Sequence, residues 1–140
     1  MKNSLNIHKA GAVIIKDRHL LVSRTRGKDI FVAPGGKLEE GESTTDAVVR
    51  ELDEEQGIRV SPVSLTMLGS FSAIAAGHEA DQKTVQMDVL LVGDFEGEPT
   101  PSAEIEENRY ITSADLGKIP LGSIFEHDVI PMLVERGLID

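Results

Sequence analysis

Cysteine is absent from the 140-residue sequence, so disulfide bonds and thiol-based catalysis are excluded. A protein without disulfides does not need an oxidising compartment, and we therefore expect a cytoplasmic location. Long hydrophobic runs are also missing, and stretches as short as Ala12–Ile15 and Val89–Val92 are among the longest. We accordingly expect neither a secretory signal peptide nor a membrane-spanning segment.

Positive charge is scarce in this chain. Lysine and arginine number 14 against 24 aspartates and glutamates, which gives a net charge of −10. This imbalance argues against binding of long nucleic acids through a basic surface. A small polyphosphate is still a candidate ligand, because metal ions can bridge two negatively charged partners.

The length and composition predict one domain covering residues 1–140. A hydrophobic content of 40% supports one core, and the chain is too short for two. Strand and helix patterns alternate, and Gly77–Gln82 is a predicted loop. Predicted strands are His8–Ile15, His19–Ser23, Ile30–Ala33, Ser64–Ala73, Thr84–Phe95 and Tyr110–Thr112, and predicted helices are Thr44–Gln56 and Ile124–Glu135. Pro131 is expected in the first turn of the second helix or at a kink in it.

The helix predicted over Thr44–Gln56 has clear signals at both ends. Ser43 or a following threonine can cap its first N–H groups, and Asp46 places negative charge in the first turn. Gly57 can adopt the left-handed conformation that ends a helix. These signals predict the bounds of the helix from local chemistry alone.

A helical wheel gives this helix an apolar stripe and a neighbouring acidic face. The stripe contains Val48, Val49 and Leu52, and the acidic face contains Glu51, Glu54 and Glu55. Like charges at this spacing repel by roughly 0.2–0.5 kcal/mol per pair, and a bound cation would remove that repulsion. Oxygen ligands without cysteine or clustered histidine suit Mg²⁺ or Mn²⁺. The alternative is a solvated acidic surface, which leaves the preceding Pro-Gly-Gly loop unexplained.

The segment GKLEEGESTTDAVVRELDEEQGI, with its prefix FVAP, resembles the Nudix box of small MutT-like hydrolases. Those enzymes cleave a phosphoanhydride in a nucleoside diphosphate linked to another group, X. The resemblance implies an α/β/α sandwich with a mixed β-sheet between helices. It also implies metal ligands at Glu51, Glu54, Glu55 and the carbonyl of Gly36. Glu42 and Arg50 match positions that orient the ligating carboxylates.

Glu104, which lies outside the box, is the candidate for a fourth carboxylate of the site. MutT-like enzymes often place a glutamate in the loop before their last short strand, a few residues ahead of an aromatic residue, here Tyr110. Glu104 would then be a further metal ligand or the general base, although Glu106, Glu107 or a plain acidic turn are alternatives. The catalytic candidates are Glu51, Glu54 and Glu104, and the sequence does not decide which is the base.

Basic and aromatic residues around the box are candidate substrate contacts. Arg24, Arg26 and Lys37 lie where they would meet phosphates, and Phe31 would stack on a base; ordinary surface and core roles are the alternatives. Among the histidines, only His78 falls in a predicted loop near substrate, and none is assigned a chemical role.

The expected reaction is Mg²⁺-dependent hydrolysis of a nucleoside triphosphate to a monophosphate and pyrophosphate. An ADP-ribose-like or nucleotide-sugar substrate is the second choice, because Gly69–Ala76 lacks the proline or tyrosine that some ADP-ribose subfamilies carry there. A non-catalytic nucleotide sensor would be expected to lose box acids, and an isoprenyl diphosphate isomerase would be expected to use a cysteine. The sequence leaves open whether the protein forms a homodimer.

Overall fold

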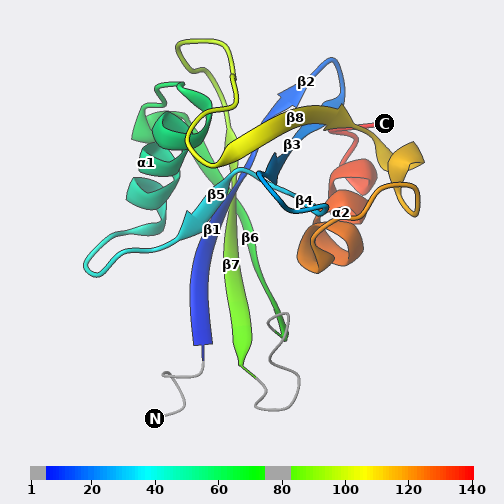
Figure 1. The fold of residues 1–140 in the computed structure, drawn as a ribbon, viewed down its shortest axis with the longest axis horizontal. Helices are drawn as coiled ribbons and strands as arrows, with labels where there is room; N and C mark the ends of the chain where they lie inside the picture. Colours follow the sequence, from blue (N-terminus) through cyan, green and yellow to red (C-terminus); the bar gives the residue numbers. More distant parts are fainter. Residues whose placement is uncertain (1–5, 75–82) are drawn as a thin grey trace.

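The computed structural model describes residues 6–74 and 83–140, and two β-sheets with helices on either side form the fold (Figure 1). Helix α1 (Thr44–Gln56) lies on one side, and helix α2 (Ile130–Glu135) lies on the other. The predicted Gly77–Gln82 loop, with His78, falls outside the described residues. The arrangement confirms the predicted α/β/α sandwich.

The first sheet has four strands in the order β5 (Gly35–Lys37), β1 (Asn6–Val13), β7 (Thr84–Val92) and β6 (Leu65–Ile74). Strands β1 and β7 run parallel over eight residue pairs from Asn6↔Thr84 to Val13↔Leu91, while the other two pairings are antiparallel. This sheet is therefore mixed, as predicted.

The second sheet is antiparallel and centres on β3 (His19–Thr25). It pairs with β2 (Ile15–Lys16), β4 (Phe31–Val32) and β8 (Ile105–Ile111). The β2–β3 turn is built from Asp17 and Arg18, which both have positive φ angles, 52° and 63°. The predicted strand at His8–Ile15 divides near Ile14, because its two parts join different sheets.

Two predictions for the strands were incomplete. Gly35 and Gly36 were predicted to form a loop, but they belong to β5 and pair with β1 through Gly11 and Ala10. The last strand was predicted as Tyr110–Thr112, whereas β8 begins at Ile105, directly after Glu104. Both strands carry glycine or charged residues that have low strand propensity, and their pairing partners impose the extended conformation.

The hydrophobic core lies in two clusters on opposite faces of the first sheet. Alternate residues of β1 supply them, with Ala10 and Ala12 facing α1 and Val13 facing α2. Within α1, Val48 and Leu52 are fully buried as predicted, but Val49 is only partly buried and Ala47 takes the core position instead.

The last helical segment changes geometry along its length. Residues Phe125–Val129 form a π-helical turn, and α2 follows with Pro131 in its first turn, as predicted. Short 3₁₀ turns lie at Pro62–Ser64, before β6, and at Ser113–Asp115, after β8. No helix in the described ranges is long and apolar enough to cross a membrane.

Candidate active site

Helix α1 is held in place at both ends. The Ser43 side chain accepts a hydrogen bond from the Asp46 N–H at 3.0 Å, and Gly57 ends the helix with a φ of 66°. Thr44 donates from Oγ1 to Asp88 on β7 at 2.7 Å, which ties the first turn to the sheet. The predicted caps therefore set the helix bounds, and Asp88 sets its position.

Arg50 is the charged centre of the acidic helix face. It forms a bidentate ion pair with Glu42, with Nε donating to Oε2 at 2.7 Å and Nη2 to Oε1 at 2.9 Å. This hydrogen bonding lowers the pKa of Glu42 to about 2. Nη2 also donates to the carbonyl of Lys37 at 3.3 Å. Arg50 thus joins the helix to the loop that follows β5.

The same guanidinium contacts two of the predicted ligand carboxylates. Its Nη1 lies 3.1 Å from Glu51 Oε2 and 3.4 Å from Glu54 Oε1. The Glu51 side chain is 14% exposed and that of Glu54 is 55% exposed, so Glu54 faces solvent while Glu51 lines the interior edge of the site. A Cβ atom at Gly36 would overlap the Glu51 carboxylate. A side chain at this position would therefore displace the Glu51 carboxylate.

Glu55 is the buried member of the acidic face, with 6% of its surface exposed. Its Oε1 accepts a hydrogen bond from the N–H of Gly35 at 3.0 Å. Burial, together with the nearby Glu51 and Glu104 carboxylates, raises the pKa of Glu55 to about 8. The hydrogen bond from Gly35 has the opposite effect and lowers this pKa. Burial also raises the pKa of Glu51, although Arg50 opposes that effect. The site holds more negative charge than its own cations balance.

Glu104 lies beside these acids, although it is about 50 residues away in the chain. Its carboxylate interacts with Glu51 and is within hydrogen-bonding reach of Glu55. Neither Glu106 nor Glu107 does so, since both pair with Arg24, at 3.5 Å and 3.1 Å. The structure thus brings Glu104 to Glu51 and Glu55, whereas Glu54 is linked to Glu51 through the shared Arg50 guanidinium.

The loop before β8 is fixed to the end of α1, which it passes in Figure 1. The N–H groups of Thr100 and Ser102 donate to the carbonyls of Gln56 and Glu55 at 3.0 Å and 2.9 Å. Ser102 Oγ donates to the Glu54 carbonyl at 2.5 Å. These bonds satisfy the last carbonyls of the helix and place Glu104, two residues later, at the acids.

The donor chemistry of this cluster fits a divalent cation, because hard carboxylate oxygens surround a close approach of the Gly36 backbone. Among residues 6–74 and 83–140, no three acidic or histidine side chains are arranged to hold a metal ion as they stand. Glu51 and Glu54 are instead turned toward Arg50. Metal binding thus requires these two flexible side chains to rotate away from the guanidinium.

The predicted substrate contacts occupy different environments. The side chains of Arg26 and Lys37 are exposed, and the Arg26 N–H donates to the Glu104 carbonyl at 2.8 Å. Arg24 is instead paired with the acids of β8. Phe31 is 4% exposed, and the Arg109 guanidinium covers its ring at 4.7 Å from the centroid. A core role suits Phe31 better than stacking on a base.

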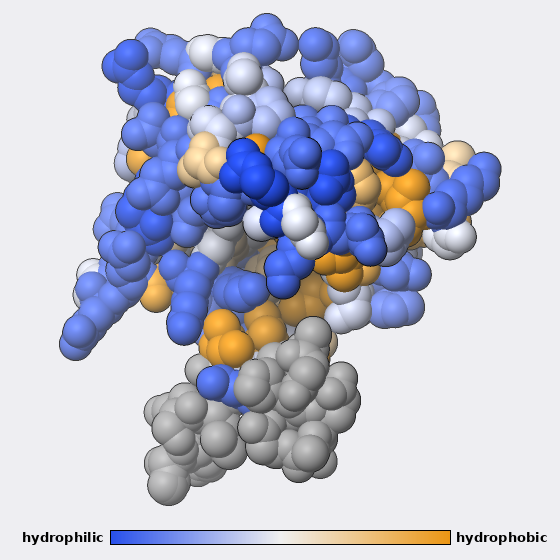
Figure 2. Space-filling model, viewed as in Figure 1, coloured by the Kyte–Doolittle hydropathy of each residue, from blue (hydrophilic) through white to orange (hydrophobic). Residues whose placement is uncertain are grey.

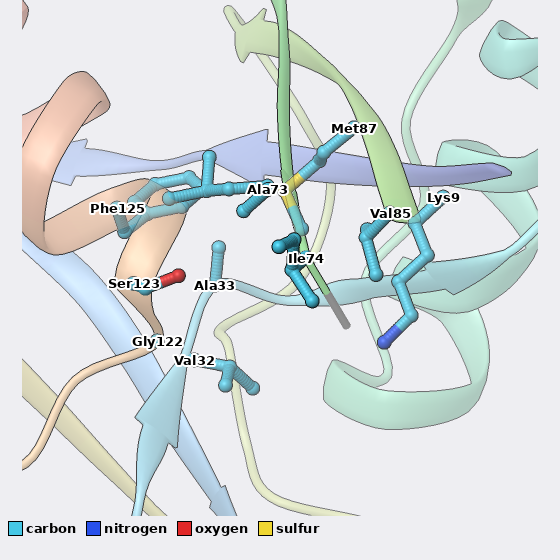
Figure 3. Close-up of a pocket in the computed structure, with 11 residues that line it drawn as sticks. Lys9, Val32, Ala33, Ala73, Ile74, Val85, Met87, Gly122, Ser123 and Phe125 are labelled. Atoms are coloured by element: carbon cyan, nitrogen blue, oxygen red, sulfur yellow. The ribbon is translucent and has the colours of Figure 1, made fainter. Parts of the chain in front are cut away.

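An apolar pocket, which the sequence did not indicate, opens on the face of the first sheet opposite α1 (Figure 3). Its walls come from several separate segments, which are β1, β4, β6, β7 and the turn before α2. The lining residues are Lys9, Val32, Ala33, Ala73, Ile74, Val85, Met87, Gly122, Ser123, Ile124 and Phe125. Figure 2 shows hydrophobic surface in a recess over this part of the fold.

Comparisons with known proteins agree with this geometry. The family model described as NUDIX domain matches residues 7–133. An oxidized purine nucleoside triphosphate hydrolase from Danio rerio is 27% identical over 104 residues, which are 73% of this chain and 61% of that protein. An ADP-ribose pyrophosphatase from Methanocaldococcus jannaschii is 29% identical over 136 residues, 92% of this chain and 75% of that protein. The crystal structure of a MutT NUDIX hydrolase from Burkholderia pseudomallei aligns with a TM-score of 0.72 at 26% identity, covering 93% of this chain and 96% of that one.

Proposed function

The chain belongs to the Nudix family of hydrolases, which act on small nucleotide substrates, and we propose that it hydrolyses a nucleoside triphosphate to a monophosphate and pyrophosphate. The observation that carries the proposal is an acid cluster in which Glu51 lies against Gly36, Glu55 accepts from the Gly35 N–H, and Glu104 lies beside both acids. An acid-rich site of this kind requires a cation before it can accept phosphates.

Nudix hydrolases generally need divalent metal ions, and Mg²⁺ is the proposed ion here, with Mn²⁺ as a substitute. The residues that would hold it are Glu51, Glu54, Glu55, Glu104 and the carbonyl of Gly36. Bound there, Mg²⁺ would neutralise the phosphates and make the attacking water more acidic. This assignment rests on oxygen donors in a site without cysteine or histidine.

The protein's own residues have separate roles in the proposed reaction. Arg50 and Glu42 orient the acids and hold the β5 loop against α1. One of Glu51, Glu54 and Glu104 accepts the proton of the attacking water, a contribution of roughly 10²–10⁴ in rate. The exposed cations of Arg26 and Lys37 would meet the phosphates of the substrate. The bond between the α- and β-phosphates breaks, and pyrophosphate leaves.

ADP-ribose is the second candidate substrate class. The archaeal ADP-ribose pyrophosphatase matches 92% of this chain, a larger share than the 73% matched by the triphosphate hydrolase. We place the triphosphate first because Gly69–Ala76 lacks the proline or tyrosine that some ADP-ribose subfamilies carry in this region.

A metal-dependent hydrolysis screen tests the proposal. Wild-type protein is incubated with Mg²⁺ and with nucleoside triphosphates, ADP-ribose, nucleotide sugars and dinucleoside polyphosphates, and the products are identified by chromatography. The proposal predicts that a triphosphate is the best substrate and yields monophosphate and pyrophosphate. Cleavage of ADP-ribose alone would replace it with the second candidate, and binding without turnover of any compound would indicate a nucleotide sensor.

A further inference from the structure

The apolar pocket contains one half-buried cation. Lys9 extends from β1 beside Val85, and Figure 3 shows its ammonium at the edge of the pocket. Within the described part of the chain, its side chain has neither an ion pair nor a hydrogen bond to a protein group. Among the described residues that line the pocket, the one other polar side chain is Ser123, which is exposed. This ammonium at the rim of an apolar pocket has no acceptor among the described residues, so a ligand that supplies one can form a new charged hydrogen bond here.

The pocket and the acid cluster are adjacent along the backbone. Ala33 lines the pocket, and Gly36, three residues later, meets the Glu51 carboxylate. Three extended residues span at most about 10 Å. Lys9 is also the Cα partner of Lys37, whose carbonyl accepts from Arg50. Strand β5 is an edge strand of the first sheet, so one ligand can pass around it and reach both faces, with its phosphates at the acids and its uncharged ring in the pocket.

The chemistry of Lys9 discriminates between rings. An ammonium donates three hydrogen bonds and accepts none, whereas the Ser123 hydroxyl donates or accepts equally well. At the ring position where adenine carries an amino group, guanine carries a carbonyl oxygen. Uracil and thymine likewise carry a carbonyl oxygen where cytosine carries an amino group. A donor-only group in the pocket favours the carbonyl and leaves the amino group without a partner.

We propose that Lys9 is a specificity-determining residue that selects nucleotides with a carbonyl-bearing base over those with an amino group at the same ring position. The proposal rests on the proposed function, because it assumes that the acids take the phosphates of the same ligand. It deepens that function by naming the class of base, namely guanine, hypoxanthine, uracil and thymine.

Two matched pairs of triphosphates test the assignment. Inosine and adenosine triphosphates differ in the oxygen or amino group on one purine carbon, and uridine and cytidine triphosphates differ likewise on the pyrimidine. Hydrogen bonds to charged groups are worth enough to predict a preference of about 10- to 100-fold in kcat/KM for the carbonyl member of each pair. Lys9→Met should bring both ratios close to one, mainly by slowing the carbonyl substrates.

Two further variants separate the role of Lys9 from general effects. Lys118→Met removes an exposed lysine on another part of the surface and should leave both ratios unchanged. Lys9→Arg retains a donor-only cation and should keep the preference for carbonyl bases. Thermal melts establish that each variant is folded. The assignment is overturned if wild type shows no preference, or if Lys9→Met slows all four triphosphates equally, as a phosphate contact would.

Binding distinguishes this inference from the proposed function. Calorimetric titration with the non-hydrolysable α,β-methylene analogues of inosine and adenosine triphosphates measures the pocket without turnover. A wild-type preference for the inosine analogue that Lys9→Met abolishes supports the role of Lys9 even if no triphosphate is hydrolysed. Turnover of triphosphates with equal binding of both analogues to wild type and Lys9→Met would retain the proposed function and reject the role of Lys9.

Discussion

Glu42 and Glu55 lie thirteen positions apart in one acid-rich segment, yet their environments favour opposite protonation states. The bidentate pair with Arg50 keeps the pKa of Glu42 at about 2, so this residue is ionised at neutral pH. Burial raises the pKa of Glu55 to about 8, so its proton is retained at neutral pH without a cation. Divergent pKa values among neighbouring carboxylates are typical of catalytic sites.

The raised pKa of Glu55 predicts how stability depends on pH without metal. An unfolded glutamate ionises near pH 4.5 and the native one near 8, so the native state binds more protons between these values. Stability from this group is therefore fully present below about pH 4.5 and decreases as the pH rises to about 8. Glu55→Gln keeps an acceptor for the Gly35 N–H and should flatten this dependence, as followed by chemical denaturation at a series of pH values.

Mg²⁺ should have the opposite pH dependence, because it binds the ionised carboxylate. Its stabilising effect on the melting temperature should grow from pH 5 to pH 8 in wild type and be much smaller in Glu55→Gln. NaCl at equal ionic strength controls for screening of the −10 net charge. Equal stabilisation by both salts at every pH would show that Glu55 does not bind the metal.

Glu104→Gln tests the residue assigned from outside the box. If Glu104 is the base, kcat at saturating substrate and Mg²⁺ should decrease by about 10²–10⁴. If it is only a metal ligand, excess Mg²⁺ or Mn²⁺ should restore much of the activity. Glu106→Gln is the matched control, since Glu106 is exposed and contacts Arg24 at the outer edge of β8. An inactive Glu106→Gln beside an active Glu104→Gln would contradict the assignment.

Among the elements, α1 was predicted with the bounds that the structure shows, Thr44–Gln56. The reason is that its ends are set by local chemistry, with a Ser43 cap and a left-handed Gly57. Strand β5 was missed because its conformation depends on pairing with β1, which is distant in sequence. Burial of Phe31 was likewise not evident locally, since a strand phenylalanine suits either a core or a ligand.

The loop that precedes β8 offers a prediction at the scale of the element. Ser102→Ala removes the hydrogen bond from Oγ to the Glu54 carbonyl, which helps to fix Glu104. We expect kcat to decrease about tenfold with little change in KM, because small displacements of a catalytic group are costly. Ser102→Thr retains the hydroxyl and should restore the rate. A lower melting temperature with unchanged kcat in Ser102→Ala would indicate a purely structural role.

At the scale of the whole molecule, a buried polar network joins the parts that carry the site. Gln56 at the end of α1 donates to Ser23 on β3 and Asn108 on β8, at 2.9 Å and 3.0 Å. Asn108 donates back to Gln56 at 2.6 Å. No side-chain polar atom buried in the described part of the chain lacks a partner. The network holds the box helix and the strand after Glu104 in one fixed arrangement.

The pocket shows the limit of prediction from sequence for the whole molecule. The box acids share one helix, so their pattern predicts their proximity. Lys9, Ala73 and Phe125 come together only through the packing of β1, β6 and the last helical segment. Each residue alone is an ordinary strand or core residue, and no periodicity relates them. Substrate preference was therefore the least predictable property, and the fold was the most predictable.

The central claim is that the acid cluster performs metal-dependent phosphoanhydride hydrolysis, and its most direct test is turnover as a function of Mg²⁺ in Glu54→Gln. Asp53→Asn is the matched control, because Asp53 is exposed on the same helix and is not among the proposed ligands. The best triphosphate from the screen is followed by pyrophosphate release. We predict a Mg²⁺-dependent rate that falls at least about a hundredfold in Glu54→Gln and is unchanged in Asp53→Asn. Equal, Mg²⁺-dependent rates in wild type and a folded Glu54→Gln would contradict the claim.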